Sequence, residues 1–139
     1  MKRKILIVED NVGLSQIQKD WLSQAGYEAV TAMNEPIARS LIRKTQFDLI
    51  LSDVRLPEGD GISLLEWLRK EKKDIPFIIT TEYVSVPDVV RTIKLGARDY
   101  LPKPVHRDYL LELAEDIFHP VATVRKQERQ LFHRTSPMI

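Results

Sequence analysis

Cysteine is absent from the 139-residue chain, and histidine occurs only at His106, His119 and His133. The first absence excludes disulfide bonds and thiolate metal sites, and the histidines are too scattered to indicate a zinc site. Any metal ion bound by this chain should therefore be held by oxygen ligands.

Long apolar runs are also missing. No stretch approaches the roughly 20 residues that a membrane-spanning helix needs. The basic start "MKRK" leads into an apolar segment too short for the core of a signal peptide. Hydrophobic residues nevertheless make up 43% of the chain, enough to build the core of one ordinary domain. We expect a cytoplasmic protein without membrane contact.

Neither sign of charge dominates the chain, which has 21 basic and 20 acidic residues. Residues 119–139 hold four basic residues and one acidic residue, whereas residues 1–118 hold 17 basic and 19 acidic residues. A basic tail without interleaved aromatic residues is more often a solvated linker than a nucleic-acid site. We therefore expect no direct nucleic-acid binding.

Short apolar runs alternate five times with amphipathic stretches. The expected strands are residues 4–10, 28–32, 47–53, 76–81 and 99–104. A helix is expected after each, with these apolar positions on its buried face: Leu14, Ile17, Trp21, Leu22 and Ala25; Ile37, Leu41 and Ile42; Ile62, Leu65 and Leu68; Val89, Val90 and Ile93; and Leu110, Leu113, Ala114 and Ile117. Because the strands are apolar throughout, they predict an α/β fold, a doubly wound parallel sheet covered by helices on both faces.

Helix starts carry capping signals. Asn34 followed by Pro36 predicts the start of the second helix, and Ser85 with Asp88 predicts the start of the fourth. Gly96 is placed to end that fourth helix.

Polar residues gather where the predicted strands end, at Glu9, Asp10, Asp53, Thr80, Thr81 and Lys103. In doubly wound sheets, ligands bind at the carboxyl ends of the strands, where the strand order reverses. Clustered carboxylates repel one another unless a divalent cation joins them, and an all-oxygen ligand set suits Mg²⁺. With magnesium and Lys103 to neutralise phosphoryl oxygens, Asp53 is the candidate nucleophile for phosphoryl transfer.

Each of these residues also has an ordinary structural explanation. Asp10 or Asn11 can cap the first helix, and Asp53 can be a turn residue. Thr81 can be a strand threonine and Lys103 a surface lysine. Their coincidence at one edge of the same predicted sheet favours a site.

Four stretches, "ILIVEDN", "DLILSDVRLPEGDG", "PFIITT" and "KLGARDYLPKP", resemble the receiver domain of bacterial two-component response regulators. The resemblance extends over residues 3–118. It implies a flavodoxin-like three-layer fold with strand order 2-1-3-4-5. It also implies a phosphoryl group received from the histidine of a sensor kinase.

The resemblance assigns a role to each matching residue. It implies Asp53 as phosphoacceptor, Lys103 as phosphate ligand, Thr81 as switch hydroxyl, Tyr100 as switch aromatic, and Glu9, Asp10, Asp53 and the main-chain carbonyl of Arg55 as Mg²⁺ ligands. It further implies a cis Lys103–Pro104 bond. Phosphorylation would draw the Thr81 hydroxyl toward Asp53, and the Tyr100 ring would turn inward.

Glu82 departs from the family pattern, which has Ala, Gly or Ser after the switch hydroxyl. An acidic side chain there can slow phosphoryl entry or shield the aspartyl phosphate from water. Thr80 is the alternative switch residue, but its spacing to Lys103 is one residue too long.

The segment "LFHRTSPMI", residues 131–139, resembles the sequence that opens the AAA+ ATPase domain of nitrogen-regulation-type, enhancer-binding transcription activators. We therefore predict a receiver domain at 1–118 and a partly helical linker at 119–139, leading to ATPase and DNA-binding domains absent from this chain. In that group the receiver and linker mediate dimerisation, which implies a homodimer through helices four and five or through residues 119–133. The alternative is a stand-alone receiver with a frayed tail.

Other function classes fit the residues less well. A flavodoxin-like flavin carrier needs a phosphate loop where this chain has the acidic "EDN". A haloacid-dehalogenase-type phosphatase needs a second acid at the position of Arg55. The remaining alternative is a pseudo-receiver, a protein-interaction module that takes no phosphoryl group. On either receiver interpretation the chain is not a turnover enzyme.

Overall fold

The computed structural model describes residues 1–120. Its five strands form one parallel sheet in the order β2-β1-β3-β4-β5, which confirms the predicted strand order. Nearly all of the predicted linker, and the whole segment 131–139, lie outside the described residues.

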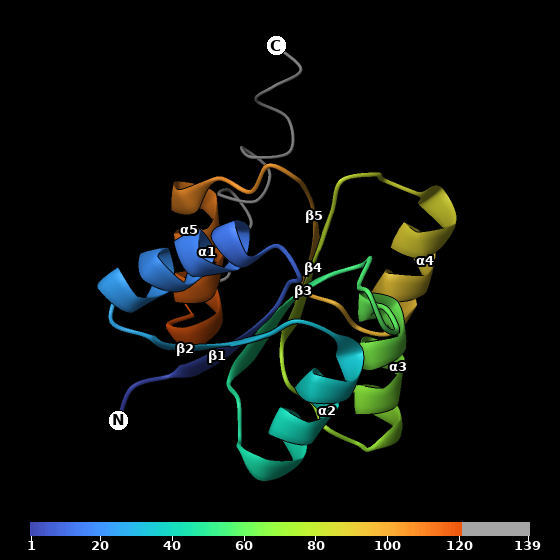
Figure 1. Cartoon of the computed structure of the whole chain (residues 1–139), viewed down its shortest axis with the longest axis horizontal. Helices are drawn as coiled ribbons and strands as arrows, with labels where there is room; N and C mark the ends of the chain where they lie inside the picture. The colour runs from blue at the N-terminus through green and yellow to red at the C-terminus, as the bar shows by residue number, and fades with distance from the viewer. Residues whose placement is uncertain (121–139) are drawn as a thin grey trace.

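Strands and helices alternate strictly along the described chain. The strands are β1 (Lys4–Val8), β2 (Glu28–Ala32), β3 (Leu49–Asp53), β4 (Phe77–Thr81) and β5 (Asp99–Pro102). The helices are α1 (Val12–Gln24), α2 (Glu35–Lys44), α3 (Gly61–Lys70), α4 (Val86–Lys94) and α5 (Arg107–Phe118). Figure 1 shows α1 and α5 together on one side of the sheet, with α2, α3 and α4 on the other.

Alternate residues of the central strands build two separate cores, one on each face of the sheet. Ile5, Ile7 and Leu51 pack toward α1 and α5, whereas Leu6 and Ile50 pack toward α2 and α3. Because both faces are covered, every position of β3 and β4 is buried. This double burial explains why these strands are apolar without alternation.

The predicted helix caps are present. Asn34 Oδ1 accepts a hydrogen bond from the backbone N–H of Ile37 at 2.9 Å, and Ser85 Oγ accepts one from Asp88 at 3.4 Å. Asn11 caps α1 by accepting from Leu14 at 3.0 Å. Asp10 is therefore not needed as the cap of α1.

Three helices differ from the predicted apolar faces. In α2 the predicted position Ile37 is 43% exposed. In α1 the buried residues are Ser15, Gln18 and Leu22, and Ile17 is 47% exposed. In α4 only Thr92 is buried, because this helix packs mainly on α3 and on β5, the short edge strand. No helix of the described part of the chain is long and apolar enough to cross a membrane.

Candidate functional site

The sheet brings three carboxylates together at the ends of β1 and β3. Val8 pairs with Ser52, so the residues that follow them, Glu9 and Asp53, leave adjacent strands side by side. One carboxylate oxygen from each of Glu9, Asp10 and Asp53 lies within 4.8 Å of the other two. Glu9 and Asp53 are buried and Asp10 is exposed, so the cluster opens to solvent on the Asp10 side.

The side chain of Lys103 reaches into this cluster from the segment after β5. Its Nζ donates to Glu9 Oε1 at 2.7 Å and to Asp53 Oδ2 at 2.8 Å. Both carboxylates are at most 10% exposed in these pairs. Hydrogen bonds between ionised partners are among the strongest in proteins, and they offset the cost of burying the charges.

Burial and pairing act in opposite directions on the protonation of this cluster. Burial raises the pKa of the Glu9 carboxyl, although Lys103 and the backbone N–H of Asn11 act to lower it. Burial alone would lower the pKa of the Lys103 ammonium, but the hydrogen bonds that it donates to Asp53 and Glu9, together with the attraction of their charges, outweigh burial and raise it. Lys103 therefore carries its positive charge at neutral pH.

Tight backbone packing holds the carboxyl end of β3 in place. The N–H of Arg55 donates to Asp53 Oδ1 at 3.3 Å, and the N–H of Gly61 donates to the Val54 carbonyl at 2.9 Å. A Cβ at Gly61 would lie 2.2 Å from the Asp53 carbonyl oxygen. Only glycine fits there, so α3 begins directly against the strand end that carries Asp53.

The donor set of this cluster fits a hard divalent cation. Three carboxylates supply oxygen atoms only, and the solvent-facing side at Asp10 leaves room for water ligands. Mg²⁺ prefers oxygen ligands and usually keeps several waters. Glu9, Asp10 and Asp53 are thus the residues that could hold Mg²⁺.

The hydroxyl of Thr81 lies at the end of β4, where it was predicted, and is engaged with the following loop. Its Oγ1 donates to the Tyr83 carbonyl at 2.9 Å and accepts from the Tyr83 N–H at 3.1 Å. The guanidinium of Arg55 lies over the Tyr83 ring, 5.0 Å from its centroid. Nothing in the sequence pattern indicated this contact of Tyr83, because neither residue lies on a buried helix or strand face.

Tyr100 lies on β5 and is half-buried. Its hydroxyl is buried and has no hydrogen-bond partner among the described residues. A hollow of about 430 Å³ beside it is lined by residues of α4 and β5, including Val89, Ile93 and Tyr100. The switch role that the resemblance implies for Tyr100 stays a prediction.

Residues 5–115 match the response regulator receiver domain family. The chain belongs to this family. The receiver family that the resemblance implied is therefore confirmed, whereas the domain boundary at residue 118 stays a prediction.

Named relatives of this receiver domain are regulators of longer sequence. The chain is 31% identical to the response regulator protein PilR of Pseudomonas aeruginosa over 140 residues, which is 99% of this chain and 32% of PilR. It is 39% identical to the transcriptional regulatory protein ZraR of Klebsiella oxytoca, over 83% of this chain and 26% of ZraR. The receiver domain thus spans about a third or less of these curated relatives.

Solved receiver domains have the same fold. A CheY-like receiver domain protein from Methanospirillum hungatei superposes with a TM-score of 0.80 at 30% identity, over 94% of this chain and 99% of that one. The non-phosphorylated HemR receiver domain from Leptospira biflexa gives 0.79 at 36% identity, over 87% and 98% of the two chains. These matches confirm the flavodoxin-like architecture.

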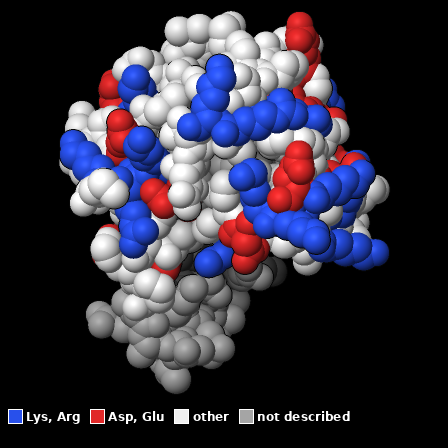
Figure 2. All heavy atoms as spheres, turned by 90° about the horizontal axis from the view of Figure 1, so that it is seen from below, with Lys and Arg blue, Asp and Glu red and all other residues white. Residues whose placement is uncertain are grey.

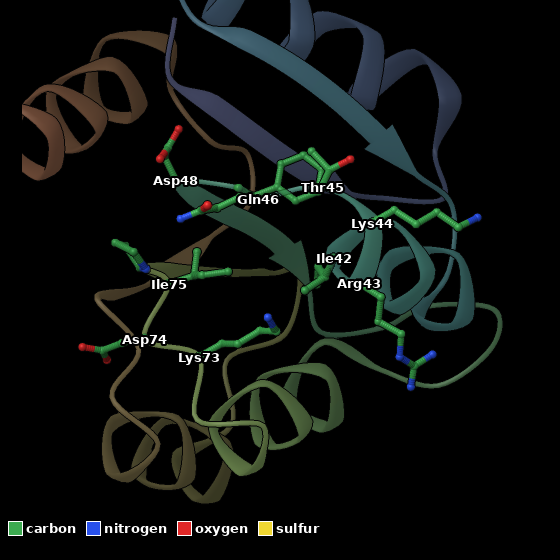
Figure 3. A pocket seen from close by; sticks show the side chains of 11 residues that line it. Ile42, Arg43, Lys44, Thr45, Gln46, Asp48, Lys73, Asp74 and Ile75 are labelled. Atoms are coloured by element: carbon green, nitrogen blue, oxygen red, sulfur yellow. The ribbon is translucent and has the colours of Figure 1, made fainter. Parts of the chain in front are cut away.

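A second hollow, of about 590 Å³, lies at the opposite end of the receiver domain, where the strands begin. Figure 3 shows Arg43, Lys44 and Lys73 around its rim, with Asp48 and Asp74 among them. Lys and Arg side chains are spread over this underside of the molecule (Figure 2). None of the candidate site residues lines this hollow, so it is separate from the carboxylate cluster.

Proposed function

We propose that Asp53 accepts a phosphoryl group from the phosphohistidine of a sensor histidine kinase, in a reaction that requires Mg²⁺. The observation that carries the proposal is the Lys103 ammonium, which lies 2.8 Å from Asp53 and 2.7 Å from Glu9. This ammonium sits beside the nucleophile, where the negative charge of an incoming phosphoryl group develops.

In the proposed reaction a carboxylate oxygen of Asp53 attacks the phosphorus atom. The P–N bond to the kinase imidazole breaks as the new P–O bond forms, and the imidazole leaves with the bond pair and takes up a proton. Glu9, Asp10, Asp53 and the Arg55 carbonyl would hold Mg²⁺, which neutralises phosphoryl oxygens when bound. Lys103 exchanges its bond to Asp53 for one to a phosphoryl oxygen. Each chain takes up one phosphoryl group on its own Asp53, so it would act as a signalling module and not as a turnover enzyme.

The proposed switch starts at Thr81. A phosphoryl group on Asp53 offers charged acceptors, to which hydrogen bonds are stronger than to the neutral Tyr83 carbonyl. The Thr81 hydroxyl would leave Tyr83 for the phosphoryl group, and the Tyr100 ring, whose hydroxyl is already buried, would turn further into the space released. Both changes would alter the face made by α4, β5 and α5. Phosphorylation would thus shift the population of molecules between two packings of this face.

We further propose that this receiver is the N-terminal part of a cytoplasmic, nitrogen-regulation-type transcription activator with downstream ATPase and DNA-binding domains. In support, the alignment with PilR covers 99% of this chain, and that with the transcriptional regulatory protein GlrR of Escherichia coli covers 97%. Both alignments extend beyond the family match and into residues 119–139. The receiver itself would regulate output without contacting DNA.

Homodimerisation is the proposed link between phosphorylation and output. Val86, Val90 and Ile93 project from α4 with exposed fractions of 73%, 45% and 66%. Three exposed aliphatic side chains on one nine-residue helix favour a contact surface. A dimer through this face, or through residues 119–133, would respond directly to movement of Thr81 and Tyr100.

The deciding experiment is intact-mass measurement after incubation with acetyl phosphate and Mg²⁺. We expect a gain of one phosphoryl group, absent in Asp53→Asn and absent without metal. A folded protein that binds Mg²⁺ but gains no mass from acetyl phosphate or from a phosphorylated kinase would instead favour the pseudo-receiver. No described residue of the cluster favours that alternative, since the acidic residues and Lys103 are all in place.

A further inference from the structure

We propose that Glu35 is a positioning residue for the magnesium-binding side of the site. Glu35 belongs to α2 and does not belong to the carboxylate cluster, but its side chain holds the loop that carries Arg55. The proposal rests on the proposed function, because it concerns the Arg55 carbonyl as a Mg²⁺ ligand.

Glu35 is a buried acid whose burial the helix does not require. It is only 5% exposed, at the first position of α2. The capping of that helix is already done by Asn34, whose side chain accepts from Ile37. A buried carboxylate destabilises a fold unless it is paired and hydrogen-bonded, so the partners of Glu35 indicate what it does.

Both carboxylate oxygens of Glu35 have partners. Oε2 accepts from the guanidinium of Arg39, one turn along α2, with the Nε contact at 2.8 Å. Oε1 accepts from the backbone N–H of Asp60 at 3.0 Å, 25 residues away in the chain. The backbone N–H of Glu35 in turn donates to the Glu58 carbonyl at 3.1 Å. Glu35 therefore binds the β3–α3 loop at two points.

Gly59 brings the loop into direct contact with this carboxylate. Its φ angle is +77°, and a Cβ at this position would lie 2.2 Å from Glu35 Oε1. The loop backbone thus passes against the carboxylate with no space for a side chain. Residues 58–60 take their position from Glu35.

The same loop segment is joined to Arg55. Arg55 and Asp60 form an isolated antiparallel bridge, and the N–H of Arg55 donates to Asp53 Oδ1. A backbone connection thus runs from Glu35 through Asp60 to Arg55, the residue whose carbonyl is the proposed fourth ligand. Groups that orient the ligands of a metal ion typically change its affinity about 10- to 100-fold when they are removed.

Arg43 supplies a control variant on the same helix as Glu35 and Arg39. The Arg39 guanidinium lies 5.0 Å from the centroid of the Trp67 ring, and the Arg43 guanidinium lies 5.2 Å from the same ring. Arg43→Ala therefore removes a similar cation–aromatic contact from the same helix but leaves the Glu35 hydrogen bonds in place.

The test is calorimetric titration of the metal-free chain with Mg²⁺, without a phosphoryl donor. We expect Glu35→Ala to weaken Mg²⁺ binding about tenfold. Glu35→Gln keeps an oxygen for the Asp60 N–H, and we expect it to stay within about threefold of wild type, as should Arg43→Ala. Hydrogen exchange of the metal-free protein should show faster exchange at residues 55–60 in Glu35→Ala and at no other strand end.

The outcomes separate this inference from the proposed function. Normal Mg²⁺ binding by both wild type and Glu35→Ala overturns the positioning role and leaves the proposed function standing. Absence of Mg²⁺ binding by the wild type overturns both. If Glu35→Ala does not fold, Gly59→Ala tests the same contact from the loop side, and unchanged Mg²⁺ affinity in that variant overturns the inference.

Discussion

The Thr81 hydroxyl forms two hydrogen bonds with the backbone of Tyr83, donating to its carbonyl at 2.9 Å and accepting from its N–H at 3.1 Å. The hydroxyl that is proposed to respond to the phosphoryl group is therefore hydrogen-bonded to the β4–α4 loop in this structure. The proposed switch would break these bonds, which would couple the loop to the phosphorylation state of Asp53.

Replacement of Thr81 by Val should uncouple the loop from phosphorylation. We expect the unfolding free energy to fall by about 1 kcal/mol, because the loop hydrogen bonds are lost. Asp53 should still gain a phosphoryl group, but hydrogen exchange at residues 82–85 should no longer change on phosphorylation. Thr80→Val is the control, since Thr80 makes only a 3.5 Å contact with the Ser52 carbonyl. A loop that still responds in Thr81→Val would rule out the hydroxyl as the switch.

Replacement of Lys103 by Met should destabilise the metal-free protein. The substitution leaves the Glu9 and Asp53 carboxylates facing each other without the ammonium that pairs with both. Breaking a buried ion pair from one side costs about 3 kcal/mol, which urea denaturation at pH 7 would measure. Lys70→Met, which alters an exposed pair with Glu66, should change stability by less than about 0.5 kcal/mol. Equal stabilities of the two variants would contradict a stabilising role for Lys103.

Tyr27 should make the fold sensitive to alkali. Burial raises the pKa of its phenol above the ordinary value of 10.0, and the negative charge of Glu115 adds to the effect. The folded state therefore disfavours the phenolate. The contribution of Tyr27 to stability is fully present below pH 10 and is lost as the pH rises through the folded-state pKa.

The measurement is urea denaturation of wild type and Tyr27→Phe from pH 8 to pH 11.5. The variant keeps an aromatic ring to pack against Phe118, whose ring centroid lies 5.2 Å from that of Tyr27. We expect the stability of the wild type to fall more steeply than that of the variant above about pH 10. Parallel pH profiles would show that Tyr27 does not contribute.

The exposed face of α4 should be dispensable for folding and required for self-association. Ile93→Lys replaces a side chain that is 66% exposed, so the unfolding free energy should change by less than about 0.5 kcal/mol. The mass of the phosphorylated protein, measured by light scattering, should shift from dimer toward monomer. Met33→Lys, at a 53% exposed position outside α4, is the control. An unchanged dimer in Ile93→Lys would move the proposed interface to residues 119–133.

Features that depend on neighbours in the chain could be predicted from the sequence. The apolar run of Leu49, Ile50 and Leu51 predicts a buried strand, and Asn34 and Ser85 predict helix starts. Each is governed by interactions within a few residues, namely strand periodicity and capping hydrogen bonds. The strand-end positions of Asp53 and Lys103 followed from the same local pattern, combined with the rule for doubly wound sheets.

Features that depend on distant packing were decided only by the tertiary structure. Lys103 meets Asp53 across 50 residues and Glu9 across 94 residues, and no local pattern fixes which oxygen it binds. Glu35 is a charged residue at the start of a helix, a position that is usually exposed, but the loop at Gly59 buries its side chain. The apolar positions of α4 were expected in the core, but the edge strand β5 offers too little surface to cover them. In each case the burial of a side chain depends on what the fold places against it, which the sequence around that residue does not encode.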